Sequence, residues 1–194
     1  MPNDTSLGMS VQDFLVWNPG DGRAWQLVDG EPQVMALADR THGTLLGELG
    51  AVIGNHLRDQ ASRCSVVMLP GIVPHVHATY NMRVPDLAVT CSDYEAEETA
   101  LTDPMLIAEI LSTNNQAETW ANVWAYTTIP SVREILVLRA TTIRADLLRR
   151  GLDGTWPRQP DTITDGDLLL DSIGFRTPLA DLYRSTRLRR SPQA

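Results

Sequence analysis

The sequence predicts an α/β (α+β) fold, in which helices flank a central mixed β-sheet. One observation is a pair of apolar runs of strand length, residues 84–90 and 105–111, which an acidic loop separates. A second is the recurrence of apolar residues at every third or fourth position from His42 to Arg58, the pattern of an amphipathic helix. A third is a helix-like segment, 117–127, which is followed by further strand-like runs. Strands interleaved with helices favour a sheet whose faces are covered by the helices.

Capping and turn residues define the N-terminal elements. Ser10 and Asp13 form a variant of the capping box, so we expect a short helix to begin there. Asp29-Gly30 is a strong hairpin signal, and it predicts strands at 25–28 and 32–35 on its two sides.

The amphipathic segment 42–58 is expected to form a long helix, with Thr41 or Asp39 as its N-cap. Its apolar stripe should pack on the sheet. Two further strands are predicted after it, at 65–69 and 72–77, with a Pro-Gly turn between them.

The C-terminal half is predicted to contain one helix and a second group of strands. These elements are the helix 117–127, a strand pair at 133–138 and 142–148, a continuation of that pair at 154–156, and, between 168 and 183, a strand end followed by a helical turn that Pro178 opens.

The length of 194 residues suits one domain with a sizeable core, since about 100–200 residues per domain is usual. We expect a single domain over 1–194, with its core at about 10–185, a short polar N-terminal tail and an arginine-rich C-terminal tail. The first ten residues lack the apolar core of a signal peptide, and no run approaches the ~20 apolar residues that span a bilayer. The expected location is therefore the cytoplasm, with no membrane association.

Cys64 and Cys91 are the two cysteines of the chain. They could touch if their strands pair, but two separate buried thiols are the expected state, because free cysteine behaves as a small apolar residue.

The formal net charge of -8 argues against broad electrostatic adhesion to nucleic acid, because such binding depends on lysine and arginine neutralising phosphates. A local basic groove remains compatible with it. All 16 basic residues are arginines, so no lysine is available for any chemistry in this chain. The stretch best suited to contact phosphate is the C-terminal arginine cluster, although such clusters are usually solvated tails. Its members are Arg184, Arg187, Arg189 and Arg190.

The candidate site is organised around two carboxylates, Asp86 and Glu109, each of which belongs to one of the two apolar runs. A buried carboxylate costs several kcal/mol unless it is paired, protonated or bound to a cation. Two converging carboxylates without a balancing cation suit Mg²⁺, which takes oxygen ligands, and Mn²⁺ could replace it. The backbone carbonyl of Ile110 could supply another oxygen. In the structural alternative, Asp86 caps a turn and Glu109 pairs with an arginine such as Arg83.

A series of short motifs runs through the chain from about residue 10 to residue 185. They are Leu27-Val28-Asp29-Gly30-Glu31, His42 at a helix start, Val84-Pro85-Asp86, Glu109-Ile110-Leu111-Ser112, Tyr126, and Ile129-Pro130-Ser131-Val132-Arg133-Glu134 before a strand. In this order they resemble the Uma-type branch of the PD-(D/E)XK nuclease superfamily, described as restriction endonucleases and also as a domain of unknown function. The resemblance implies a restriction-endonuclease-like core, Mg²⁺-dependent hydrolysis of DNA phosphodiester bonds, and a homodimer acting on two-stranded DNA.

Several positions depart from the resembled pattern. The superfamily commonly has a lysine two residues after the glutamate, where this chain has Leu111, and the Uma-type branch has a lysine where this chain has Asn122. A glutamate of the first hairpin is replaced by Gln26. Both amides retain hydrogen-bonding ability without charge, so Gln26 could ligate a cation and Asn122 could orient water. His42 stands where the branch often has a histidine, and it could serve the site or only cap and pack.

Two classes of function remain open at this point. The leading interpretation is a Mg²⁺-dependent endonuclease-like protein, slowed by the missing charges. Its rival is a catalytically degenerate nuclease-fold domain that serves as a binding or assembly module, which Gln26, Leu111 and Asn122 favour. A weaker third interpretation is a hydrolase of a small phosphorylated or nucleotide substrate.

The remaining candidate side chains have ordinary structural interpretations. His75 and His77, on one face of the expected strand, could ligate a transition metal, although no third ligand lies nearby in the sequence. Trp120 and Trp124 lie one helical turn apart and are expected in the core or at a subunit contact, with base stacking as the alternative.

Overall fold

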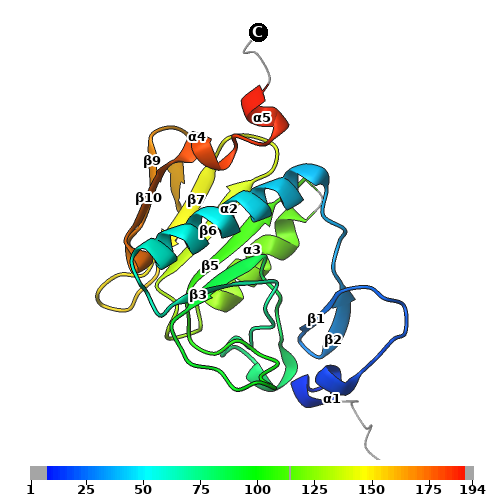
Figure 1. The fold of residues 1–194 in the computed structure, drawn as a ribbon. Coiled ribbons are helices and arrows are strands. Elements are labelled where there is room, and N and C mark those ends of the chain that lie inside the picture. Colours follow the sequence, from blue (N-terminus) through cyan, green and yellow to red (C-terminus); the bar gives the residue numbers. More distant parts are fainter. Residues whose placement is uncertain (1–7, 114, 191–194) are drawn as a thin grey trace, which may run out of the picture.

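The computed structural model describes residues 8–113 and 115–190, and it centres on a six-stranded mixed sheet (Figure 1). The strand order is β3-β4-β5-β6-β7-β8, and every neighbouring pair is antiparallel except β5 and β6, which are parallel. The bounds are β3 Ser65–Met68, β4 Leu87–Thr90, β5 Pro104–Leu111, β6 Glu134–Arg139, β7 Ala145–Arg149 and β8 Asp161–Ile163. The predicted mixed sheet is therefore confirmed.

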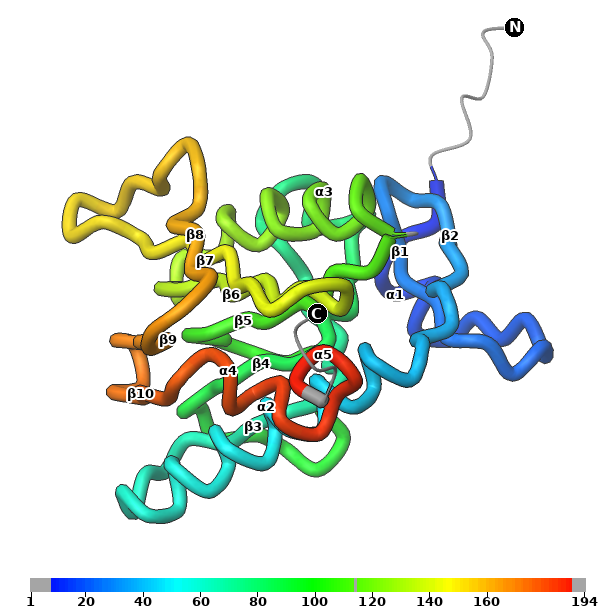
Figure 2. Tube along the Cα trace, turned by 90° about the horizontal axis from the view of Figure 1, so that it is seen from above, coloured from blue at the N-terminus to red at the C-terminus, as the bar shows by residue number. Residues whose placement is uncertain are grey.

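Two helices cover opposite faces of this sheet, as the view along the sheet in Figure 2 makes plain. Helix α2 (Arg40–Asp59) turns Leu45, Leu49, Ile53 and Leu57 towards one apolar cluster. Helix α3 (Gln116–Tyr126) connects β5 to β6 and contributes to the other cluster. Neither α2 nor any other helix in the described part of the chain combines the length and apolar character that a membrane crossing requires.

The N-terminal elements form a small unit beside the sheet. Helix α1 (Val11–Val16) begins at the predicted capping box, in which Ser10 and Asp13 bond each other's backbone. Strands β1 (Trp25–Val28) and β2 (Glu31–Val34) pair through a two-residue turn. Both turn residues, Asp29-Gly30, have positive φ (48° and 83°), which is the conformation of a type I′ hairpin.

The C-terminal segment forms a second small hairpin and short helical turns. These elements are β9 (Asp167–Leu170), the 3₁₀ turn η2 (Asp171–Ile173), β10 (Phe175–Pro178), α4 (Leu179–Leu182) and α5 (Arg187–Arg190). The other 3₁₀ turn, η1 (Ala78–Tyr80), lies between β3 and β4. Arg184 forms an ion pair with Glu48 of α2 (Nη2–Oε2 2.9 Å), so the arginine cluster begins docked on the fold. The outermost predicted tails, 1–7 and 191–194, lie outside the described residues.

Two strand predictions were wrong. Only Ile72 of the 72–77 run pairs, in an isolated bridge with Arg83, because Pro74 cannot donate to a ladder and His77 takes a left-handed φ of 47°. The 154–156 segment is a turn, and the strand that continues the sheet is β8, further along the chain.

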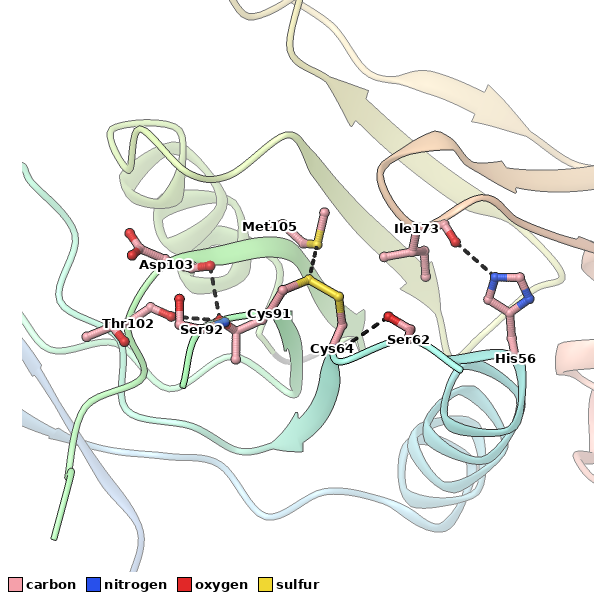
Figure 3. Close-up of a disulfide and its surroundings, with 10 residues drawn as sticks. His56, Ser62, Cys64, Cys91, Ser92, Thr102, Asp103, Met105 and Ile173 are labelled. Carbon is pink, nitrogen blue, oxygen red and sulfur yellow. Dashed lines mark hydrogen bonds between the residues drawn. A yellow bond between two sulfur atoms is a disulfide. The ribbon is translucent and has the colours of Figure 1, made fainter. Parts of the chain in front are cut away.

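The expectation of two separate thiols was also wrong, because Cys64 and Cys91 form a disulfide (Figure 3). Ser65 pairs with Thr90 in the antiparallel register of β3 and β4, so the two cysteines are the next opposed residues. Their backbones therefore approach closely, with a Cα–Cα distance of 3.9 Å. The bridge joins the edge strand β3 to the interior of the sheet.

Candidate active site

The end of the β4–β5 pairing brings Asp86 and Glu109 together. Leu87 lies opposite Ala108, so Asp86 and Glu109 are the next opposed positions, and opposed residues of antiparallel strands project from the same face. Both side chains are buried, with 7% and 6% of their residue surface exposed. The register of β4 and β5 thus places the two carboxylates side by side at the edge of the apolar core.

Asp86 is held by hydrogen bonds at both carboxylate oxygens. Its Oδ1 lies 2.7 Å from Nε2 of His42, and its Oδ2 accepts from the backbone N–H of Ile110 at 2.7 Å. His42 is itself fixed in the first turn of α2, where the Asp39 side chain caps its backbone N–H at 2.8 Å. The orientation of Asp86 is therefore set by two elements at once.

The hydroxyl of Tyr126 donates a hydrogen bond to Oε1 of Glu109 at 3.0 Å. Burial and then the charge of Asp86 raise the pKa of the Glu109 carboxyl well above its usual value. Burial also raises the pKa of the Tyr126 hydroxyl, as does the neighbouring Glu109 charge, so this hydroxyl stays a donor. The carboxylate pair is thus strongly repulsive, and a cation bound there would relieve the repulsion.

A second cluster lies along the same face of α3. Glu118, Asn122 and Tyr126 follow one another at intervals of four residues, so their side chains form a row. Gln26 of β1 donates to Glu118 Oε1 at 2.7 Å and accepts from Asn122 Nδ2 at 3.3 Å. Arg83 donates from Nη1 to Asn122 Oδ1 at 3.0 Å. Through Gln26 at one end and Tyr126 at the other, this row connects the β1–β2 hairpin to the buried carboxylates.

Comparison with protein families decides the classification. A family model named Uma2 and described as "Putative restriction endonuclease" matches residues 11–179. The chain belongs to the Uma2 family. The resemblance inferred from the ordered motifs is thereby confirmed.

A solved structure has the same fold as this Uma2 member. It is titled as a putative nuclease belonging to DUF820 from Anabaena variabilis, and its TM-score with this chain is 0.72 at 16% sequence identity. The match covers 90% of this chain and 97% of that one. A search of curated protein sequences gave no match.

The site positions expected from the sequence fall into two neighbouring groups. His42, Asp86, Glu109 and Ile110 form the carboxylate group, while Gln26 and Asn122 bond each other in the α3 row. The Ile110 N–H points to the side of β5 on which β4 lies, just beyond the end of β4. The N–H and C=O of one strand residue point to the same side of the strand. The carbonyl of Ile110 therefore faces the Asp86 side of β5.

Three residues of this arrangement were not identified as site residues from the sequence. Tyr126 and Glu118 belong to the same helix face as Asn122, so their spacing of four residues was the available signal. Arg83 was considered only as an ion-pair partner for Glu109, but its side-chain hydrogen bonds are to two asparagines instead. Its long-range contacts leave no local sequence pattern.

The other histidine and tryptophan candidates lie apart from this site. His77 contacts Asp29 through Nδ1 at 2.9 Å, and neither His77 nor His75 lies on a strand, so the shared strand face predicted for them was wrong. Trp120 packs on the apolar cluster under α3, whereas Trp124 is 42% exposed. Within the described ranges no three or more His, Cys, Asp or Glu side chains form a group that could hold a metal.

Proposed function

We propose that this Uma2 member is a Mg²⁺-dependent endonuclease-like protein that hydrolyses DNA phosphodiester bonds, slowed by its uncharged amides. The observation that carries the proposal is the buried Asp86–Glu109 pair. Burial, and then repulsion by Asp86, raise the Glu109 pKa, and the contacts of the pair include no arginine among the described residues. Such a pair is costly unless a cation is bound, because burial removes the water that would solvate the charges.

The donor set fits a hard divalent cation. Asp86 and Glu109 would hold Mg²⁺ through carboxylate oxygens, and the Ile110 carbonyl would add a third oxygen. With only two carboxylates, water and substrate oxygens would complete the coordination, which is usual for Mg²⁺. Mn²⁺ accepts the same oxygen donors and could substitute. When bound, such a cation supplies an activated water and stabilises the leaving oxygen in phosphodiester hydrolysis.

The residues of the chain position the two carboxylates. His42 and the Ile110 N–H fix the orientation of Asp86, and the Tyr126 hydroxyl fixes that of Glu109. Neither carboxylate would therefore need to reorient when a cation binds. Burial keeps bulk water away from both groups. Electrostatic interactions are stronger in such a dry environment than at an exposed surface.

Gln26 and Asn122 limit the expected rate. Each can orient water or a ligand by hydrogen bonding, but neither places a full charge next to the reacting group. Loss of one positioned stabilising group typically costs ~3–4 kcal/mol in the transition state, or roughly a hundredfold to a thousandfold in rate. We therefore propose that cation binding is retained better than catalysis.

A second candidate function is a catalytically degenerate module that binds or assembles through the nuclease fold. The observation that favours it is that both amides are engaged within the protein, Gln26 with Glu118 and Asn122 with Arg83. An amide held in this way is less free to orient a water molecule.

Nicking of supercoiled plasmid in Mg²⁺ and Mn²⁺ separates the two functions. We expect weak wild-type cleavage in Mn²⁺, an increase with Asn122→Lys, and none with the Asp86→Ala, Glu109→Ala double variant. Calorimetric titration of Mg²⁺ and Mn²⁺ into wild type and Asp86→Ala provides a readout without catalysis. Metal binding without cleavage in any variant would favour the degenerate module, whereas cleavage that persists in the double variant would contradict the site.

We further propose that the chain forms a homodimer, as the resembled nucleases do in cutting two-stranded DNA. The exposed Trp124 on α3 is one apolar side chain available for a subunit contact. Light scattering at micromolar concentration should give twice the monomer mass of 21.4 kDa. A monomer under those conditions would contradict the assembly and weaken a double-strand cutting role.

The proposed location is the cytoplasm, an inference from composition. Thiols are generally kept reduced in that compartment. Cys64 and Cys91 would then form their bridge only under oxidising conditions.

A further inference from the structure

Arg83 carries a buried guanidinium that is held by neutral groups. Only 6% of its surface is exposed. Nη1 donates to Asn122 Oδ1 at 3.0 Å, and Nη2 donates to Asn81 Oδ1 at 2.9 Å. Its Nε–H is buried and has no hydrogen-bond partner in the described structure. A buried donor without a partner is costly in free energy, and more so when it is charged.

Amide side chains separate this cation from the nearest acids. Asn81 stands between Arg83 and Asp29, donating from Nδ2 to Asp29 Oδ1 at 2.9 Å. On the other side, Asn122 and then Gln26 stand between Arg83 and Glu118. No ion pair joins Arg83 to a carboxylate within the described ranges. The orientation of the guanidinium is therefore fixed, but no direct contact neutralises its charge.

Helix α3 links the Arg83 cation to the carboxylate pair. Asn122, which it contacts, precedes Tyr126 by one helical turn, and the Tyr126 hydroxyl bonds Glu109. Along the chain, Arg83 precedes Asp86 by three residues. Arg83 and the two carboxylates also have nearly equal exposure, 6–7% of the residue surface, so all three open to solvent to a similar small extent.

Resting on the proposed nuclease function, we propose that Arg83 binds a phosphate group of the nucleic-acid substrate beside the Asp86–Glu109 pair. The planar guanidinium matches the geometry of phosphate oxygens, and it is always charged. Asn81 and Asn122 set its orientation without neutralising its charge, and the buried Nε–H leaves the guanidinium incompletely satisfied by the protein. The site then combines carboxylates for a cation with a separate cation for the phosphate.

The test compares Arg83→Gln, which removes the charge, with Arg83→Lys, which retains it without the planar fork. Arg158→Gln is the matched control, because it removes one positive charge from an exposed loop between β7 and β8 at the far edge of the sheet. Fluorescence anisotropy measures binding of a labelled DNA duplex with Ca²⁺ in place of Mg²⁺. Thermal unfolding in phosphate against chloride, at equal ionic strength, measures binding of inorganic phosphate. Calorimetry measures Mg²⁺ binding in each variant.

We expect Arg83→Gln to weaken DNA binding about tenfold to a hundredfold, the usual range for a hydrogen bond to a charged group. Arg83→Lys should lose less, and Arg158→Gln should match the wild type. Mg²⁺ affinity in Arg83→Gln should equal or exceed that of the wild type, which establishes that the carboxylate site is folded. Phosphate should stabilise the wild type more than Arg83→Gln.

The outcomes distinguish this inference from the proposed function. Equal phosphate stabilisation and equal DNA binding in wild type and Arg83→Gln would overturn the role of Arg83. Phosphate stabilisation that depends on Arg83, in a wild type that neither binds nor cleaves DNA, would support the anion site and overturn the nuclease function. Loss of Mg²⁺ binding together with a lower unfolding temperature in both Arg83 variants would identify a structural residue and contradict the proposal.

Discussion

Buried carboxylates lie at two places on the sheet, and their hydrogen-bond partners differ in charge. Asp86 and Glu109, at the β4–β5 end, contact a histidine, a tyrosine hydroxyl and a backbone N–H. Glu134 of β6 and Asp146 of β7 are buried equally well or better, but arginines surround them. The sheet therefore provides an internal reference for what a structural buried acid looks like in this protein.

Both carboxylate oxygens of Asp146 accept hydrogen bonds from arginine side chains. Arg139 reaches Oδ2 with Nε at 3.1 Å and Nη2 at 2.9 Å, and Arg144 reaches Oδ1 at the same two distances. Thr162 donates a further hydrogen bond at 2.8 Å. Burial raises the pKa of Asp146, but the bonds from Arg144, Thr162 and Arg139 outweigh burial, so its net pKa lies below the usual value.

The contrast with Glu109 shows what distinguishes a candidate functional acid from a structural one. Burial raises the pKa of both carboxyls. The pKa of Asp146 is nevertheless lowered overall by its hydrogen bonds from arginines and Thr162, whereas that of Glu109 stays raised by burial and then by the charge of Asp86. Perturbed acids without a matching cation are more frequent at functional sites, where stability is given up for ligand binding. Three substitution experiments test this comparison.

The largest expected difference is in activity. Asp86→Asn should lower metal-dependent DNA cleavage at least about a hundredfold, the usual scale for a positioned charged group. Asp146→Asn should leave the rate per folded molecule unchanged, because its contacts are with Arg139 of β6, Arg144 of the β6–β7 loop and Thr162 of β8. Plasmid nicking at a temperature where both variants are folded provides the measurement. An equal loss in both variants would remove the distinction between the two acids.

The next largest difference is in stability, and it runs the other way. Asp146→Asn should cost about 3 kcal/mol of unfolding free energy, the lower end for breaking a buried ion pair, because Arg139 and Arg144 can still reach water. Asp86→Asn should cost less than ~1 kcal/mol, since it removes a repulsive charge and keeps a hydrogen-bonding side chain. Urea unfolding gives both values. A larger loss for Asp86→Asn would identify it as a structural residue.

The same contrast explains how much of this protein could be predicted from its sequence. The carboxylate strands, the α2 stripe and the Asp29-Gly30 turn each rest on local periodicity or turn chemistry, and the structure has all of them. The 72–77 run has alternating character too, but Pro74 and the left-handed His77 prevent a ladder, which alternation alone does not reveal.

The site was predictable only where its residues interrupt a local pattern. Asp86 and Glu109 are conspicuous because each is an acid in an apolar run. Arg83 is not conspicuous, because its role depends on contacts 39 residues along the chain with Asn122, and an arginine is common before a strand. The cysteine bridge depends likewise on the register of β3 and β4, which the sequence does not specify.

The smallest expected effect, and the most diagnostic, is the change with pH in the stability of Glu109→Gln relative to the wild type. The pKa of Glu109 is raised in the folded state above its ordinary value of 4.5, so the folded protein favours the protonated carboxyl. Its contribution to stability is fully present below pH 4.5 and is lost as pH rises through the folded pKa. The amide of Glu109→Gln keeps an oxygen for the Tyr126 hydroxyl and has no charge to lose. The variant should therefore unfold about 2 °C above the wild type at neutral pH without metal, a shift that corresponds to ~0.5–1 kcal/mol in a chain of this size.

Asp146→Asn supplies the control of opposite sign for that measurement. The pKa of Asp146 is lowered below its ordinary value of 3.8, so its stabilisation is present above pH 3.8 and is lost only as pH falls through the folded pKa. The advantage of Glu109→Gln should thus grow from pH 4.5 to pH 8, while the deficit of Asp146→Asn stays constant there and shrinks in stronger acid. Adding Mg²⁺ at pH 8 should raise the wild-type unfolding temperature and leave Glu109→Gln nearly unchanged, because only the intact pair gains from a bound cation. A Glu109→Gln variant less stable than the wild type across this pH range would mean that the carboxylate is held by an attractive contact. Glu109 would then be a structural buried acid, as Asp146 is.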